Sequence, residues 1–263
     1  MFTSKEFLEK SITDGDFYPF YQPIVDTLTK RMVGCEVLMR WRYPLHGSCF
    51  VCAGKFIEMV ENFGLLALLT KKMLRQVEED LKGCLFTGRP SFFININVNF
   101  SLLMNSSFME LFITMAKTFR MAGVNLVAEI TERENAMEFP GLSDMFYILD
   151  SHCVDVAIDD FCTGYSTPSL LTLTGAKYVK IDKSFLSQKV YNCKDRLSDV
   201  VRLARSTGAK IIAEGVDCES KIKQASNNNI EFMQGFWFGY PSPFKSLYYE
   251  YLREQDRYNS RIN

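Results

Sequence analysis

The chain has 263 residues, of which 47% are hydrophobic and 23% are charged, which is enough apolar material for a large core and excludes a disordered chain. Its 30 basic and 31 acidic residues give a net charge of −1, so no bulk positive field attracts DNA, RNA or an anionic membrane. The chain has no apolar run of membrane-spanning length and no apolar leader, and its 8 scattered cysteines are typical of reduced thiols, so the sequence predicts a soluble cytoplasmic protein.

Apolar periodicity predicts strands and helices that alternate along the chain. The expected strands are Phe20–Val25, Met32–Met39, Phe92–Val98, Leu126–Ile130, Val154–Ile158, Tyr178–Ile181, Lys210–Ala213 and Phe232–Gly235. The expected helices are Gly54–Asn62, Leu65–Lys82, Ser107–Met121, Leu142–Ser151, Ser169–Thr174, Lys194–Ser206, Glu219–Asn227 and Phe244–Gln255.

The connection between the first two expected strands is too short for a helical crossover, so these strands should pair antiparallel. The remaining order is that of successive strand and helix units over a parallel sheet. The sequence therefore predicts an α/β fold, a modified (β/α)8 TIM-type barrel with an antiparallel first strand. We expect one domain over residues 1–263, with its core at about 17–256.

Polar residues, most of them acidic, stand in or just after the expected strands. In a (β/α)8 barrel the active site is built at the carboxyl ends of the strands. The residues in question are Glu36, Asn97, Glu129, Glu132, Asp159, Asp160, Lys180, Asp182, Glu214, Asp217 and Gln234. Strand alternation puts Asn95, Asn97 and Asn99 on one face but does not choose among them.

Several of these acids would repel one another at a single barrel mouth unless cations were present. The acids are Glu36, Glu129, Asp159, Asp160 and Glu214. An all-oxygen set suits hard ions such as Mg²⁺ or Mn²⁺, and two such ions can clamp both oxygens of a phosphoester displacement. Lys180 would then be a cation or base at the same centre, and Arg40 a phosphate fork.

A single acid at a strand end is more often a helix cap or half of a surface ion pair. Glu132 and Asp217, which stand close to helix starts, remain open between that role and a role in a site. A polar residue at the end of nearly every strand is harder to assign to capping alone. The pattern as a whole therefore favours a site.

These segments, in this order, resemble the EAL family of cyclic di-GMP phosphodiesterases, from FYPFYQPIVD to MQGFWFGYPSP. CEVLMRW is similar to E-A-L-x-R-W, INVNFS to N-x-S and AEITE to E-L-T-E. IDDFCTGYS is similar to D-D-F-G-x-G-Y-S, VKIDKSF to K-I-D-x-S-F, IIAEGVD to A-E-G-V-E and MQGFWFGYP to Q-G-x-x-x-x-x-P. The resemblance implies hydrolysis of one phosphodiester bond of cyclic di-GMP to linear pGpG, with two Mg²⁺ or Mn²⁺ ions per site.

The resemblance also assigns roles to residues. One ion would be held by Glu36, Asn97, Glu129 and Asp159, and the other by Asp159, Asp160 and Glu214. The catalytic residues would be Lys180, Glu214 and Glu36; substrate would be bound by Gln22, Arg40, Asp182 and Gln234; and the loop after the aspartates would be stabilised by Glu132 and Asp217. Cyclic di-GMP is the expected small-molecule partner, with no nucleic acid or membrane, and the family implies a homodimer.

The sequence departs from the family pattern at several positions. Cys162 replaces a glycine, Asp217 is one methylene shorter than the usual glutamate, and LHGSCFVCAGKFIEMVE is longer and lacks a proline. A positive φ at Cys162 would carry a Cβ penalty. Two other readings stay open: a catalytically silent module that binds cyclic di-GMP or a regulatory protein, and an unrelated metal-dependent barrel lyase.

Overall fold

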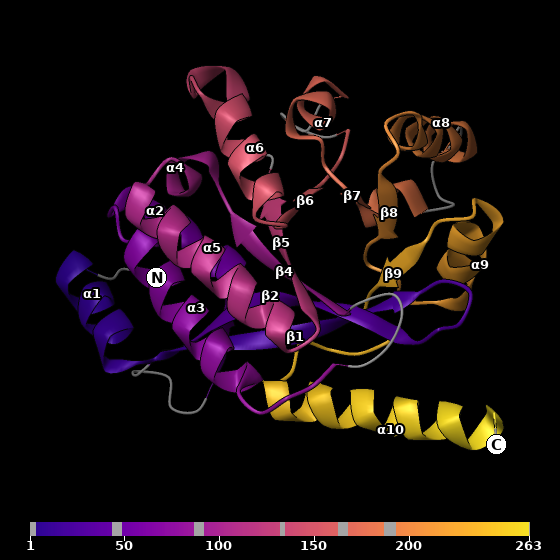
Figure 1. Cartoon of the computed structure of the whole chain (residues 1–263), viewed down its shortest axis with the longest axis horizontal. Helices are drawn as coiled ribbons and strands as arrows, with labels where there is room; N and C mark the ends of the chain where they lie inside the picture. Colours follow the sequence, from indigo (N-terminus) through magenta and orange to yellow (C-terminus); the bar gives the residue numbers. More distant parts are fainter. Residues whose placement is uncertain are drawn as a thin grey trace.

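The computed structural model describes residues 4–43, 49–86, 92–131, 135–162, 168–186 and 193–262. Within these residues eight strands close into a barrel surrounded by helices (Figure 1). The barrel strands are β1 (Phe17–Asp26), β2 (Met32–Arg42), β4 (Phe92–Val98), β5 (Val124–Ile130), β6 (Asp155–Ile158), β7 (Tyr178–Ile181), β8 (Lys210–Ala213) and β9 (Phe232–Gln234). A short strand, β3 (Phe50–Cys52), pairs with the end of β2.

The strand β1 runs antiparallel to both of its neighbours, β2 and β9, whereas the other neighbouring barrel strands are parallel. The turn between β1 and β2 is held by Asp26, whose carboxylate accepts hydrogen bonds from the backbone N–H groups of Leu28 and Thr29. This tight turn leaves no room for a crossover helix. The predicted modified (β/α)8 barrel with an antiparallel first strand is confirmed.

The outer helices follow the strands in chain order. They are α2 (Ile57–Asn62), α3 (Leu66–Leu81), α4 (Phe100–Leu103), α5 (Ser106–Met121), α6 (Leu142–Ser151), α7 (Pro168–Thr174), α8 (Cys193–Ser206) and α9 (Glu219–Asn227). The last helix, α10 (Phe244–Ile262), lies along the hairpin of β1 and β2 (Figure 1). It continues past the expected end at Gln255. In the part of the chain that the structure describes, no helix is both long enough and apolar enough to cross a membrane.

Three of the helices and strands were not predicted from the sequence: the four-residue helix α4, an N-terminal helix and the short strand β3. The helix α1 (Lys5–Asp14) begins where the Ser4 hydroxyl accepts a hydrogen bond from the N–H of Phe7, and it ends at Gly15 in the left-handed region. Its apolar side chains Leu8 and Ile12 join the main hydrophobic core. The strand β3 is only three residues long, so its pattern is too short to read without the pairing partner β2.

The interior of the barrel is layered. The part of the interior farther from the carboxyl ends of the parallel strands is filled by an apolar plug. The plug is formed by Ile24, Val33, Phe93, Val127, Ala157, Tyr178, Ile212 and Phe232. Two positions closer to the mouth, the strands carry Gln22, Asn95, Glu129, Asp159, Lys180, Glu214 and Gln234. Side chains two residues apart on a strand point to the same face. The polar residues therefore form the layer directly above the plug, at the carboxyl ends of the parallel strands.

Candidate active site

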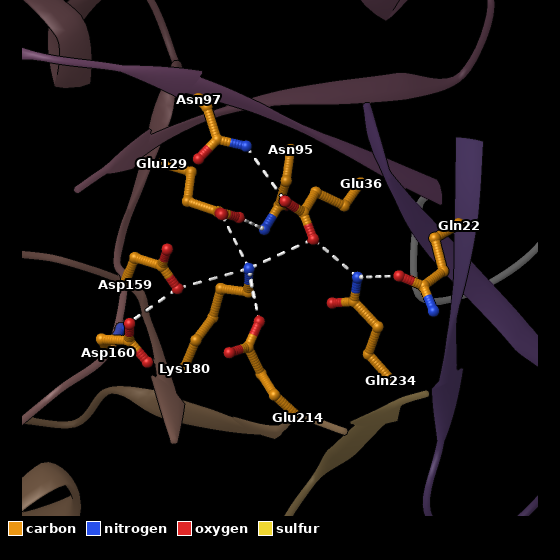
Figure 2. Close-up of polar contacts among 10 residues, drawn as sticks. All are labelled: Gln22, Glu36, Asn95, Asn97, Glu129, Asp159, Asp160, Lys180, Glu214 and Gln234. Atoms are coloured by element: carbon orange, nitrogen blue, oxygen red, sulfur yellow. Dashed lines mark hydrogen bonds and ion pairs between the residues drawn. The ribbon is translucent and has the colours of Figure 1, made fainter. Parts of the chain in front are cut away.

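Lys180 lies at the centre of the polar layer (Figure 2). Its Nζ is 2.6 Å from Glu214 Oε1, 2.7 Å from Glu129 Oε1, 3.3 Å from Glu36 Oε2 and 3.4 Å from Asp159 Oδ1. The side chain is fully enclosed, with 1% of the residue exposed. One ammonium group cannot balance four surrounding carboxylates, so ionisation of all four would leave the site strongly negative.

Glu36, on β2, is held by amide groups as well as by Lys180. Asn97 donates a hydrogen bond of 3.0 Å from Nδ2 to Glu36 Oε1, and Gln234 donates one of 2.6 Å from Nε2 to Oε2. The same Gln234 nitrogen lies 3.2 Å from Gln22 Oε1 (Figure 2). Side chains from β4, β7 and β9 thus meet at this carboxylate of β2, which fixes its orientation, and Gln22 of β1 contacts it through Gln234.

The aspartate doublet follows β6. Adjacent side chains of an extended strand point to opposite faces, which would separate the two carboxylates. Here Asp160 has a φ of 45°, a left-handed conformation that aspartate tolerates better than most residues, and its N–H donates to Asp159 Oδ1. Both carboxylates and that of Glu214 consequently offer oxygen atoms that lie within 4.8 Å of one another.

Burial and crowding shift the proton affinities of these groups. Burial raises the pKa of Glu214 to about 8, and repulsion from Asp159 and Glu36 adds to that rise although Lys180 opposes it. Burial, followed by repulsion from Glu36, also raises the pKa of Glu129 well above its usual value. Burial opposes ionisation of Glu36, but Lys180 and the amide hydrogen bonds outweigh it and lower the pKa. The cation-free site therefore retains protons at neutral pH.

The oxygen-rich donor set fits hard divalent cations. Carboxylate and amide oxygens are the ligands that Mg²⁺ and Mn²⁺ prefer. The excess of carboxylates over the single ammonium group requires further positive charge if all of them are to ionise. In addition, Gln234 Oε1 is a buried oxygen without a hydrogen-bond partner among the described residues.

A hollow extends from this centre toward the helices α2, α3 and α4. Acidic and amide residues line its inner end, namely Glu36, Asn97, Asp159 and Asp160. Most of the other lining side chains are apolar, including Leu38, Ile57, Leu66 and Leu69, although Glu61, Thr70, Asn99 and Thr131 also line the hollow. Such a combination of a few convergent polar groups with apolar walls is typical of a small-molecule site.

Three further residues were predicted from the sequence to bind substrate, and each has contacts within the protein. Gln22 donates to the carbonyl of Gly239, and Arg40 lies over the ring of Phe20, 5.8 Å from its centroid. The carboxylate of Asp182 accepts a hydrogen bond of 2.8 Å from the N–H of Ser184. Their expected contacts with a substrate stay predictions.

Asp217 and Glu132 were both expected to stabilise the loop after the aspartates. Asp217 is 55% exposed at its side chain and forms a 3.0 Å ion pair with Lys221 on α9. This contact suits a carboxylate close to the start of a helix. Glu132 lies outside the described residues.

Asn95 and Asn97 on β4, and Asn99 directly after it, make different contacts. Asn97 contacts Glu36, whereas the Asn99 side chain accepts a hydrogen bond from the N–H of Leu102 and caps α4. Asn95 is completely buried and donates a hydrogen bond of 2.8 Å to Glu129 Oε2. Asn95 was not predicted from the sequence to be a site residue. It could have been found from its position two residues after the inward-facing Phe93, because side chains two residues apart on a strand share a face.

Comparison with known proteins gives a consistent result. A family profile described as the EAL domain matches residues 5–241. The relative PdeG of Escherichia coli (strain K12), named a probable cyclic di-GMP phosphodiesterase, is 32% identical over 253 residues, which cover 93% of this chain and 48% of PdeG. PdeL of the same strain, named a cyclic di-GMP phosphodiesterase, is 29% identical over 249 residues, which cover 94% of this chain and 68% of PdeL.

Among solved structures, the EAL enzyme Bd1971, in a form described as bound to cAMP and cyclic di-GMP, matches with a TM-score of 0.83 at 25% identity. The match covers 94% of this chain and 68% of that chain. The fold and the site define the class of protein. It is an α/β-barrel protein with an antiparallel first strand and an acidic site around a lysine at the strand ends. Within that class, the chain belongs to the EAL domain family. It spans about half the length of PdeG, at 48%.

The residue after Phe161 has a strained backbone. Cys162 has a φ of 67°, in the left-handed region where a side chain is unfavourable. This is the position at which the EAL pattern has glycine. The penalty expected from the sequence is therefore present in the loop that follows the aspartate doublet.

We expect Cys162→Gly to be more stable to unfolding than Cys162→Ala by roughly 0.5 to 1 kcal/mol. This value is the left-handed strain of about 1–2 kcal/mol less the greater unfolded-state entropy of glycine. Both variants lack the thiol, so their difference isolates the backbone. Urea unfolding of the two purified variants measures it, and equal midpoints with equal slopes would contradict the prediction.

Proposed function

We propose that this chain hydrolyses one phosphodiester bond of cyclic di-GMP to linear pGpG with two divalent cations, Mg²⁺ or Mn²⁺. The observation that carries the proposal is the convergence of Glu36, Glu129, Asp159 and Glu214 on Lys180, with Asp160 beside them. Membership of the EAL domain family and the similarity to PdeG and PdeL, which are named as cyclic di-GMP phosphodiesterases, support the substrate class. The hollow beside the acids offers space for a small molecule.

In this proposal the carboxylates divide between the two cations. The first would be held by Glu36, Asn97, Glu129 and Asp159, and the second by Asp159, Asp160 and Glu214. When bound, such ions supply positive charge to the phosphoryl oxygens and make an attacking water more acidic. The close approach of Asp159, Asp160 and Glu214 supports the second set.

The remaining roles fall to residues of the chain itself. Lys180 is central enough to orient the attacking water and to take part in proton transfer with Glu214, which lies 2.6 Å away. Gln234 holds Glu36 and would help to place the same water. Gln22, Arg40 and Asp182 would contact the nucleotide, and Glu132 and Asp217 would stabilise the loop after the aspartates.

A product assay tests the proposal. Purified protein is incubated with cyclic di-GMP and Mg²⁺ or Mn²⁺, and the nucleotides are separated by chromatography. We expect pGpG to accumulate with either ion and not with excess chelator. Absence of pGpG under all metal conditions would refute the proposed activity.

Cation binding should release protons and become tighter as the pH rises toward 8. Because burial raises the pKa of Glu214 to about 8, the group is largely protonated at pH 6, and a cation must displace its proton. The apparent affinity should rise by up to about tenfold per pH unit per proton below pH 8, and level off above it. Titration calorimetry with Mn²⁺ between pH 6 and 8, in buffers of different ionisation enthalpy, measures both effects. A flat profile would contradict the prediction.

A catalytically silent module that binds cyclic di-GMP or a regulatory protein is the second candidate. The left-handed conformation at Cys162 favours it, because strain in the loop after the doublet can displace the aspartates. Calorimetric binding of cyclic di-GMP in Ca²⁺ or chelator, run beside the product assay, separates the two functions. Tight binding without pGpG would support the silent module.

The proposal also includes a cytoplasmic location, where the thiols of the described cysteines, which are free, stay reduced. It further includes a homodimer and no nucleic-acid partner. Light scattering of the purified protein at several concentrations measures the oligomeric state. A mass of one chain at all concentrations would remove the homodimer from the proposal.

A further inference from the structure

Asn95 forms part of the floor of the polar layer. It stands between Phe93 of the apolar plug and Asn97 of the site, and all three lie on the inward face of β4. Its side chain is completely buried, and its Nδ2 donates to Glu129 Oε2 over 2.8 Å (Figure 2). Among the described residues, its Oδ1 has no hydrogen-bond partner.

Burying an amide at this place is unfavourable unless the amide has a specific partner. An unpaired buried acceptor loses its hydration without compensation, and the plug immediately below shows that apolar side chains fit this interior. If the side chain at position 95 served only to fill the interior, leucine or valine would be more favourable there than asparagine. Among the residues that the structure describes, the hydrogen bond to Glu129 is the contact that accounts for an amide at this position.

The contact orients Glu129. Asn95 lies opposite Glu36 in the register of β2 and β4, yet it donates to Glu129 on the other neighbouring strand. Because Glu129 Oε2 is held by this amide, Oε1 is the oxygen that faces Lys180, at 2.7 Å. An N–H donor also favours the ionised form of a buried carboxylate, which is the form that binds a cation.

We infer that Asn95 is a positioning residue for the candidate cation site: its amide fixes Glu129 so that one carboxylate oxygen is presented to Lys180 and to a divalent cation. The inference rests on the proposed function, because it takes Glu129 to be a cation ligand. Groups that hold ligands in this way commonly alter metal affinity by 10–100-fold when they are removed.

The test is calorimetric titration of Mn²⁺ into wild-type protein and into Asn95→Leu, which keeps the approximate volume and removes the donor. We expect the variant to bind Mn²⁺ about 10–100-fold more weakly. Asn125→Leu is the matched control, because Asn125 lies on the inward face of the neighbouring strand β5 at the opposite end of the barrel. The control should bind Mn²⁺ as the wild type does.

Asn95→Ser serves if the leucine variant does not fold. It removes atoms rather than adding them, and its shorter hydroxyl leaves Glu129 less firmly held, so we expect weaker Mn²⁺ binding that is closer to that of the wild type. Wild-type affinity in either folded variant would overturn the inference, even if the melting temperature changed. Failure of the wild type to form pGpG concerns the proposed function alone, because the Mn²⁺ comparison needs no turnover. If the wild type binds no Mn²⁺ and no Mg²⁺, both fall.

Discussion

Lys180→Met is expected to reduce hydrolysis of cyclic di-GMP by about 10²–10⁴-fold, the range for loss of a positioned proton-transfer group. Methionine keeps much of the volume but removes the ammonium group that lies within 3.4 Å of four carboxylates. The measurement is the initial rate of pGpG formation at saturating Mn²⁺. Turnover within a few-fold of the wild type would show that Lys180 takes no part in the reaction.

The same substitution should also destabilise the cation-free protein. Removing one partner of a buried ion pair typically costs about 3–5 kcal/mol, here lessened because burial raises the pKa values of Glu129 and Glu214, so that these two groups are not left as unpaired charges. Added Mn²⁺ should recover part of the loss, because it supplies the missing positive charge. Lys177→Met is the control, since Lys177 is 46% exposed and its ion pair with Asp155 lies at the other end of the barrel. The control should change neither quantity appreciably.

Glu36→Gln is expected to lower turnover by 10²-fold or more and to weaken cation binding by at least about 10-fold. The carboxylate of Glu36 accepts from Asn97 and from Gln234 on its two oxygens. An amide in its place brings an N–H group against one of those donors and removes a negative charge beside Lys180. The change in size is minimal, so the overall fold should persist.

The outcome is measured as pGpG formation and Mn²⁺ affinity on the same preparation, with circular dichroism as the check on folding. Glu58→Gln is the matched control, because Glu58 is exposed on α2 and the chemical change is identical. Full activity of a folded Glu36→Gln protein would remove Glu36 from the catalytic and cation-binding sets. Nucleotide binding that survives in both Lys180→Met and Glu36→Gln would show that substrate recognition and chemistry are separable.

The order of strands and helices was readable from the sequence because it depends on local periodicity. Strands β4, β7 and β8 begin and end where the alternation of apolar residues predicts. The antiparallel first strand followed from chain length alone, since the connection to β2 is too short for a crossover. The acidic residues could be assigned to one site because the carboxyl ends of parallel strands meet at one end of a barrel.

Only the tertiary structure decided which of these residues touch. Asn95, Asn97 and Asn99 share one face in the sequence, but one holds Glu129, one holds Glu36 and one caps α4. The left-handed backbone at Asp160 brings both aspartates to one side, which strand alternation would not predict. Sequence periodicity fixes the face on which a side chain lies. Its partner across the barrel depends on the stagger and closure of the strands, which are set by contacts between segments far apart in the chain.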